Sequence, residues 1–141
     1  MSRMILSGAR VMTPGTDGEA VSVVIRDGLI ESLVAEPGKE GERIDLGGGW
    51  LLPGFIDTQV NGGGGVLLND QPDVDGIAAI AQAHRRFGST GLLPTFISDD
   101  LDRVAAVMDA MDAAIAQGVP GLLGLHIEGP FINVERRGIH K

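Results

Sequence analysis

The chain of 141 residues has no cysteine, no tyrosine, one tryptophan and few basic side chains. Without cysteine it can form neither a disulfide bond nor a thiolate metal site. Its 11 lysines and arginines stand against 19 acidic residues, which gives a net charge of −8. Phosphate binding needs clustered basic side chains, so this balance argues against a nucleic-acid partner, and it gives no support for docking onto an anionic membrane.

A long apolar run is also absent. The opening segment "MSRMILSGARVM" contains no apolar stretch of signal-peptide length, and no stretch approaches the length of a membrane span. We therefore expect a soluble cytoplasmic protein. Hydrophobic residues make up 43% of the chain, which is enough for a packed core, and the 22 glycines indicate many tight turns and close backbone approaches.

The segment before residue 51 predicts a small antiparallel β unit. It contains four short β-rich runs: "MILSGARVM", "AVSVVIRDG", "LIESLVAE" and "ERIDLGGGWLLPG". Asp27 and Gly28 end the second run, and Asp-Gly between two β-rich runs is a strong hairpin signal. We therefore expect a hairpin that turns at these two residues.

From residue 51 onward the pattern changes to strand, helix, strand, helix, strand. The strands are expected in "WLLPGFIDTQV", "GLLPTFIS" and "GLLGLHIEGP". The first helix is expected over 75–88, with one apolar stripe formed by Ile77, Ile80, Ala81, His84 and Phe87. The second helix is expected to follow the capping residues 98–100 and to stop at Gly118. Its predicted stripe is Leu101, Val104, Ala105, Met108, Met111 and Ile115.

Apolar strands that alternate with amphipathic helices imply parallel strands covered on both sides. Three such strands are too few to complete either common parallel architecture. A closed (β/α)8 barrel takes about 250 residues, and a doubly wound sheet usually has five or more strands. We therefore expect the chain to be the N-terminal part of a larger protein. A small three-layer domain that is complete as it stands is the alternative.

Polar residues at the ends of the predicted strands are the candidates for chemistry, because ligands bind at the carboxyl ends of parallel strands. Asp57, Gln59 and Asn61 share a face at the end of the first strand, and His126 and Glu128 share a face at the end of the third. Each set has an ordinary structural alternative. The amides could bond the loop backbone, and the His-x-Glu pair could be a hydrogen-bonded histidine beside a solvated carboxylate.

Other polar features favour structural roles. The run "NGGGG" is not a phosphate-binding P-loop, because the Gly-Lys-Ser/Thr ending is missing, and it is not a dinucleotide fingerprint. His84 lies among apolar neighbours on a predicted helix. Arg136 and Arg137 are interpreted as surface charge.

Taken together, these segments resemble the amidohydrolase superfamily, in which a small β-sandwich made from both chain ends precedes a (β/α)8 barrel. The run "VVIRDGLIESL" followed by "LLPGFIDTQVNG" is similar to the opening of that superfamily. Most members carry His-x-His on the first barrel strand, where two imidazoles bind a metal, but this chain has Gln59-Val60-Asn61. That departure, with "NGGGGVLLND" and "GLHIEGPFIN…RRGIHK", resembles the N-acetylglucosamine-6-phosphate deacetylase family. The resemblance runs from residue 4 to the last residue.

The resemblance implies an α/β fold. Residues 1–50 would form part of the small β-sandwich, and residues 51–141 would form the first three β strands and two helices of a TIM-like (β/α)8 barrel that is incomplete in this chain. The implied activity is metal-dependent hydrolysis of the acetamide of N-acetylglucosamine 6-phosphate to glucosamine 6-phosphate and acetate. The implied partner is thus a small amino-sugar phosphate, and the full-length protein would be a homodimer.

The resemblance also implies roles for individual residues. Glu128 matches the metal-binding glutamate, and Ile139 and His140 match the pair that contacts the substrate. Gln59 and Asn61 match the variant that has lost the two-histidine metal site, which suggests one divalent metal. The two side chains would then contact either the residues that bind the metal or a water molecule bound to it. Zinc is expected first, while iron, manganese or cobalt would also suit such ligands. Two further histidines and the proton-handling aspartate would lie beyond residue 141, so this chain alone is expected to be inactive.

Two other functions remain open at this stage. One is a different amidohydrolase, such as a dihydroorotase-like or N-acyl-amino-acid hydrolase, although those relatives generally keep His-x-His on the first strand. The other is a non-catalytic small α/β module that acts as a binding or assembly partner.

Overall fold

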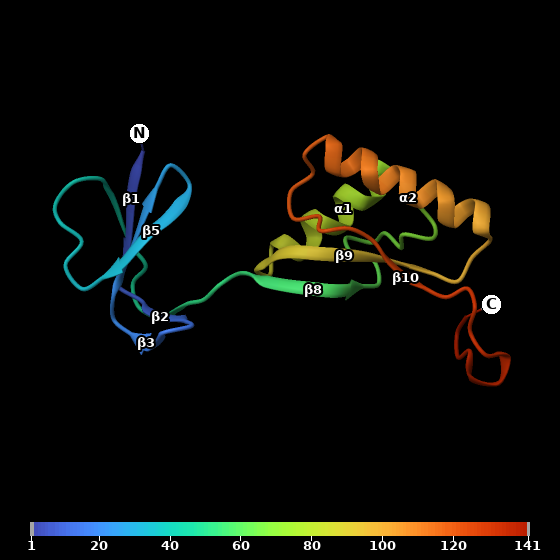
Figure 1. Ribbon diagram of the computed structural model, residues 1–141, viewed down its shortest axis with the longest axis horizontal. Coiled ribbons are helices and arrows are strands. Elements are labelled where there is room, and N and C mark those ends of the chain that lie inside the picture. Colours follow the sequence, from blue (N-terminus) through green and yellow to red (C-terminus); the bar gives the residue numbers. More distant parts are fainter. Residues whose placement is uncertain (1, 141) are drawn as a thin grey trace. The chain divides into compact units, whose positions relative to one another are not determined.

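The computed structural model describes residues 2–140 (Figure 1). The chain divides into two compact units, Met1–Pro53 and Gly54–Lys141, each with its own secondary structure. In the part of the chain that the structure describes, no helix is both long enough and apolar enough to cross a membrane.

Within its described residues, the first unit contains seven short strands in two sheets. The strands are β1 (Arg3–Ser7), β2 (Arg10–Thr13), β3 (Thr16–Glu19), β4 (Ser22–Arg26), β5 (Leu29–Val34), β6 (Glu42–Asp45) and β7 (Trp50–Leu51). One sheet has the order β5-β4-β1-β6 and the other the order β3-β2-β7. Ile5 and Val24, which face each other between β1 and β4, are buried almost completely.

The hairpin predicted at residues 27–28 is confirmed. Strands β4 and β5 pair in antiparallel fashion, with Arg26 opposite Leu29 across the turn. Asp27 has φ 49° and Gly28 has φ 82°. Two central residues in the left-handed region are what a type I′ turn requires, and the twist of that turn matches the twist of the strands.

The expectation of a purely antiparallel unit is wrong. Strand β6 pairs with β1 in parallel, and β7 pairs with β2 in parallel. The reason lies in the connections. A tight turn reverses the chain between β4 and β5, but β6 returns to the opposite edge of the sheet through residues 35–41. A longer connection can bring a strand back in the same direction as its new neighbour.

The second unit alternates strands and helices, as the sequence predicts. Its elements are β8 (Phe55–Val60), α1 (Val74–Arg85), β9 (Ser89–Ile97), α2 (Leu101–Ala116), β10 (His126–Glu128) and the short 3-10 helix η1 (Val134–Arg136). The sheet order is β10-β9-β8, and both pairings are parallel. The predicted third strand is short, and Leu122 before it makes a single parallel bridge to Leu92.

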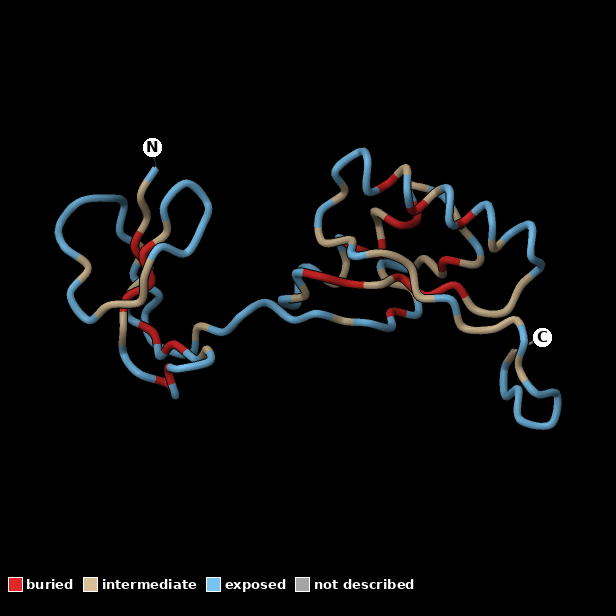
Figure 2. The backbone as a smooth tube through the Cα atoms, in the orientation of Figure 1, coloured by how far each residue is buried: buried red, intermediate tan, exposed pale blue. Residues whose placement is uncertain are grey.

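Both helices of this unit lie on the same side of the sheet (Figure 1). They contact each other, and Phe96 of β9 packs fully buried in a core that includes Ile77 and Ile80 of α1 and Val107 of α2. Figure 2 shows the buried positions on β9 and on both helices. In the described residues the helices cover one face, so the expected cover on both sides of the strands is not seen. Each new strand is added at the same edge of the sheet, so right-handed crossovers place both helices on the same face. Helices reach the other face only where a later strand is added at the opposite edge.

Helix α1 begins with a side-chain cap. Asp73 Oδ1 accepts a hydrogen bond of 2.8 Å from the Gly76 backbone N–H, which satisfies a donor that the first turn leaves free. The helix ends at Arg85, earlier than the predicted 88, so Phe87 lies outside it and is 80% exposed. His84 Nε2 lies 2.9 Å from Gly62 O, a bond that ties the glycine-rich loop to α1 and supports the structural role expected for this histidine.

The buried face of α2 differs from the predicted stripe. Val107, Met111 and Ala114 are buried, whereas Leu101, Met108 and Ile115 are 45% or more exposed. Apolar residues occur on two adjoining faces of this helix, and each set satisfies the helical spacing. The period alone could not determine which set faces the sheet.

Candidate functional site

The carboxyl ends of β8, β9 and β10 lie along one edge of the sheet, because the three strands are parallel neighbours. Each strand end carries a polar residue there. Gln59 is the penultimate residue of β8, Ser98 directly follows β9, and Glu128 is the last residue of β10. This is the edge at which the sequence predicts the chemistry.

Glu128 is contacted at both oxygens of its carboxylate. Gln59 Nε2 donates a hydrogen bond of 3.1 Å to Glu128 Oε2. His140 Nε2 lies 3.2 Å from Glu128 Oε1. The Glu128 side chain is 33% exposed and that of His140 only 10%. The carboxylate is therefore held in place while one side of it stays open.

His140 reaches Glu128 although twelve residues separate them in the chain. The segment after β10 folds back through η1, where Asn133 Oδ1 accepts a hydrogen bond of 2.9 Å from the Glu135 backbone N–H. The His140 backbone N–H then donates to Arg137 O at 3.0 Å. Ser98 Oγ lies 2.9 Å from His140 Nδ1, so both ring nitrogens have a partner.

The other predicted residues lie farther from this cluster. Asn61 is exposed beyond the end of β8, and among residues 2–140 its side chain makes no hydrogen bond to Glu128. His126 Nδ1 lies 3.2 Å from Thr95 Oγ1, its register partner on β9, as the structural interpretation of this histidine expects. Ile139 is 85% exposed and lines a neighbouring cavity.

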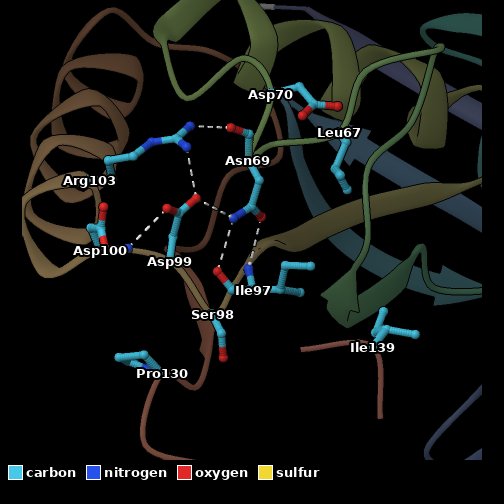
Figure 3. A pocket seen from close by; sticks show the side chains of 10 residues that line it. All are labelled: Leu67, Asn69, Asp70, Ile97, Ser98, Asp99, Asp100, Arg103, Pro130 and Ile139. Atoms are coloured by element: carbon cyan, nitrogen blue, oxygen red, sulfur yellow. Dashed lines mark hydrogen bonds and ion pairs between the residues drawn. The ribbon is translucent and has the colours of Figure 1, made fainter. Parts of the chain in front are cut away.

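That cavity has a volume of about 520 Å³ and lies beside the end of β9 (Figure 3). The Asn69 side chain forms its inner wall through paired bonds to the Ile97 backbone, with Nδ2 donating to the carbonyl and Oδ1 accepting from the N–H, both at 3.0 Å. Asn69 Nδ2 also donates to Asp99 Oδ2 at 3.1 Å, and Arg103 Nη1 lies 3.0 Å from the same oxygen. Arg103 Nη2 also donates to the Asn69 carbonyl.

Sequence reasoning missed Asn69 and Ser98 as members of the site. Asn69 lies in a loop and its partners are about thirty positions away, so no local period or spacing points to it. Ser98 is expected at the end of the second predicted strand and as a cap of the second helix, but the sequence predicts no role for it in the site. The signal that could have found it is its position directly after a parallel strand, where Gln59 and Glu128 were found.

Two side chains of the kinds that bind metal ions meet at this edge of the sheet. Glu128 offers a carboxylate oxygen and His140 an imidazole nitrogen, and both ligand types suit zinc. No group of three or more His, Asp or Glu side chains able to hold a metal ion occurs within residues 2–140. A catalytic zinc needs three protein ligands, so further ligands would have to come from outside this range.

Comparison with known proteins places this geometry in context. No protein-family model matches the chain. An N-acetylgalactosamine-6-phosphate deacetylase from Shewanella sp. (strain ANA-3) is 42% identical over 97% of this chain and 36% of its own length. An N-acetylglucosamine-6-phosphate deacetylase from Haemophilus influenzae is 35% identical over 85% of this chain and 32% of its own length.

A solved structure agrees with these relatives. The crystal structure of N-acetylglucosamine-6-phosphate deacetylase from Pasteurella multocida superposes with a TM-score of 0.92, at 29% identity, over 99% of this chain and 37% of that chain. The chain thus spans about a third of the length of the proteins it matches. In sequence and in fold, the chain matches the N-terminal portion of N-acetylglucosamine-6-phosphate deacetylases.

Proposed function

We propose that this protein hydrolyses the acetamide of N-acetylglucosamine 6-phosphate to glucosamine 6-phosphate and acetate, with the help of one divalent metal ion. The observation that carries the proposal is the position of Glu128 at the carboxyl end of β10, with Gln59 and His140 on its two oxygens. The names of the relatives support the reaction class. Because the chain spans about a third of their length, their activity is extended to it here as a proposal.

We assign the two units to the architecture that this function needs. Strands β8, β9 and β10 with helices α1 and α2 correspond to the first strands and helices of a (β/α)8 barrel, and residues 1–50 correspond to part of a small β-sandwich. Two features support the assignment: the strands are all parallel, and both helices lie on one face. A closed barrel carries its helices on the outside and its catalytic groups at the carboxyl ends of its strands.

Glu128 would provide the carboxylate ligand of the metal. It fits this role because it is an acceptor with an open side, held at a strand end by donors on both oxygens. Two histidines and a proton-handling aspartate from outside the described residues would complete the site. Zinc is the first expectation, and iron, manganese or cobalt would suit the same ligand types. When bound, such an ion lowers the pKa of a coordinated water to about 7 and polarises the acetamide carbonyl.

The neighbours of Glu128 would orient it and contact the substrate. The Gln59 amide fixes one carboxylate oxygen, in the position where other amidohydrolases place a histidine. Asn61, just beyond the same strand end, is proposed to contact the water molecule that the metal would bind. His140 and Ile139 would contact the sugar phosphate. The His140 ring and the exposed Ile139 can pack on the apolar face of the sugar ring.

A specific observation favours a second substrate. The relative with 42% identity is named for N-acetylgalactosamine 6-phosphate, which differs from the glucosamine compound only in the configuration of one hydroxyl. Both substrates present the same acetamide and the same phosphate to the site. The dihydroorotase-like and N-acyl-amino-acid alternatives have weaker support, because Gln59 and Asn61 replace the histidine pair that such enzymes generally carry.

The test is an acetate-release assay on the full-length protein loaded with zinc. The panel contains the two 6-phosphorylated N-acetylhexosamines, their unphosphorylated forms, an N-acetyl amino acid and dihydroorotate. We expect hydrolysis of a phosphorylated N-acetylhexosamine and its loss with a chelator. Preference for the amino acid or for dihydroorotate would overturn the proposal. A homodimer, proposed for the full-length protein, is checked by light scattering on the same sample.

A further inference from the structure

Ser98 connects the end of β9 to His140. Its Oγ lies 2.9 Å from His140 Nδ1, while Nε2 of the same ring faces Glu128 at 3.2 Å. Ser98 is half-buried and belongs to the wall of the cavity in Figure 3. One hydroxyl therefore holds the ring that contacts the carboxylate.

The chemistry of the two partners determines which ring nitrogen carries the proton. An ionised carboxylate only accepts hydrogen bonds, so His140 Nε2 must donate to Glu128 Oε1. In the neutral ring Nδ1 is then an acceptor, and the Ser98 hydroxyl is the donor beside it. A methyl group at position 98 could not fill this role.

Water is a poor substitute for the hydroxyl at this position. The His140 side chain is only 10% exposed. Without the Ser98 hydroxyl, the buried Nδ1 would lack a hydrogen-bond partner, which costs free energy. The ring can avoid this cost by rotating Nδ1 towards solvent. Such a rotation would also remove Nε2 from Glu128.

Hydrogen bonds hold the backbone before Ser98 and the side chain of the residue after it. The Asn69 side chain bonds the Ile97 backbone N–H and carbonyl at 3.0 Å each, in the way a neighbouring strand would. On the other side, Asp99 is held by Asn69 at 3.1 Å and by Arg103 at 3.0 Å. The hydroxyl therefore projects from a segment that the Asn69 side chain holds at Ile97.

Gly129 allows Ser98 to approach the chain next to Glu128. Its φ is 98°, and a Cβ on this residue would collide with Ser98 Oγ. The hydroxyl also lies 3.4 Å from the Glu128 carbonyl oxygen, a longer contact than the one to His140. The glycine that follows Glu128 thus provides the space in which the Ser98 and His140 side chains meet.

We propose that Ser98 is a positioning residue of the active site, whose hydroxyl fixes the tautomer and the orientation of His140 against Glu128. Its effect on turnover rests on the proposed function, whereas its effect on the His140 ring does not. Ser98 acts through His140 and has no contact of its own with the reacting groups in this account.

The kinetic test uses the full-length, metal-loaded protein with N-acetylglucosamine 6-phosphate. Ser98→Ala is expected to raise KM about tenfold, the order of a lost hydrogen bond to a buried group, with a smaller effect on kcat. Ser98→Thr keeps the hydroxyl and should restore most of the affinity. Ser89→Ala, a change of the same kind at the other end of β9, should leave both constants unchanged.

A double-mutant cycle separates positioning from general stability. In a His140→Ala background, Ser98→Ala should add little to KM, because the ring on which it acts is gone. Fully additive effects, or an unchanged KM in the single variant, would overturn the proposal. If Ser98→Ala does not fold, Ser98→Cys gives the same comparison with a similar size and a weaker donor.

Nitrogen NMR of the His140 ring gives a readout that does not depend on activity. The wild-type ring should be protonated at Nε2 and accept at Nδ1, and Ser98→Ala should shift the Nδ1 resonance towards that of a free acceptor. A ring protonated only at Nδ1 would overturn the inference. If the protein hydrolyses none of the sugar phosphates, the proposed function fails, while this measurement still decides the role of Ser98.

Discussion

Gln59 Nε2 lies 3.1 Å from Glu128 Oε2, although 69 positions of sequence separate the two residues. The bond joins the ends of β8 and β10, the two outer strands of a three-stranded parallel sheet. In this chain the amide of Gln59 orients the carboxylate of Glu128. The contact holds Glu128 in the position in which we propose that it binds a metal ion.

Glu128→Gln should reduce both metal content and turnover. A neutral amide replaces a charged ligand, so we expect turnover to fall by at least about a hundredfold and the metal to be lost more readily on dialysis. Metal analysis and acetate release on the full-length protein measure the two effects. Glu135→Gln, at an exposed position of η1, is the matched control. Wild-type metal content and rate in Glu128→Gln would remove Glu128 from the site.

His140→Ala should mainly weaken substrate binding. The imidazole is assigned to the sugar phosphate, so KM is expected to rise about tenfold or more while the metal content stays close to that of the wild type. Steady-state kinetics and metal analysis check this. Arg136→Ala, a nearby surface substitution, should change neither quantity. Loss of the metal in His140→Ala would show that the ring is a ligand and that its assignment to the substrate is wrong.

Phe96→Ala should destabilise the second unit strongly. Phe96 is fully buried in the core between β9 and the two helices, so its removal leaves a cavity and should cost about 3–5 kcal/mol in the free energy of unfolding. Denaturant unfolding measures the change. Phe131→Ala removes the same side chain from a position that is 90% exposed, and it should cost less than about 0.5 kcal/mol. Equal losses in the two variants would contradict the described core.

The first unit offers a pH-dependent prediction that is independent of the site. A hydrogen bond of 2.7 Å from Arg26 Nε, followed by the attraction of its charge, lowers the pKa of Glu31. A carboxyl group whose pKa is lower when folded contributes stability above its unfolded pKa, and this contribution is lost as the pH falls through the folded pKa. Both side chains are exposed, so the contribution is small. An NMR titration should show the Glu31 pKa moving up in Arg26→Gln, and an unmoved value would contradict the pairing.

Local signals in the sequence predicted much of the fold. Asp27 and Gly28 determine their own turn, and the alternation of strands and helices follows from short-range periods. The convergence of Gln59 and Glu128 was predictable for a different reason: parallel neighbours bring their carboxyl ends to one edge. The sequence thus places both residues at that edge, whereas the role of Glu128 as a metal ligand comes from the family resemblance and stays a prediction.

Other features depend on contacts that no local pattern encodes. Helix α2 has apolar side chains on two faces, so only the packed sheet determines that Val107 is buried and Met108 exposed. Ser98 and Asn69 gain their roles from partners 28 to 42 positions away, and a single serine or asparagine near a strand end is common. The parallel pairing of β6 and β7 likewise depends on β1 and β2, whose residues lie far earlier in the chain.

The most direct test is a crystal structure of the full-length protein with anomalous diffraction recorded at the absorption edge of its metal. The account predicts an anomalous peak about 2.0–2.2 Å from a carboxylate oxygen of Glu128, with two further protein ligands from outside residues 2–140. A metal bound elsewhere, with the Glu128 carboxylate turned away from it, would contradict the account.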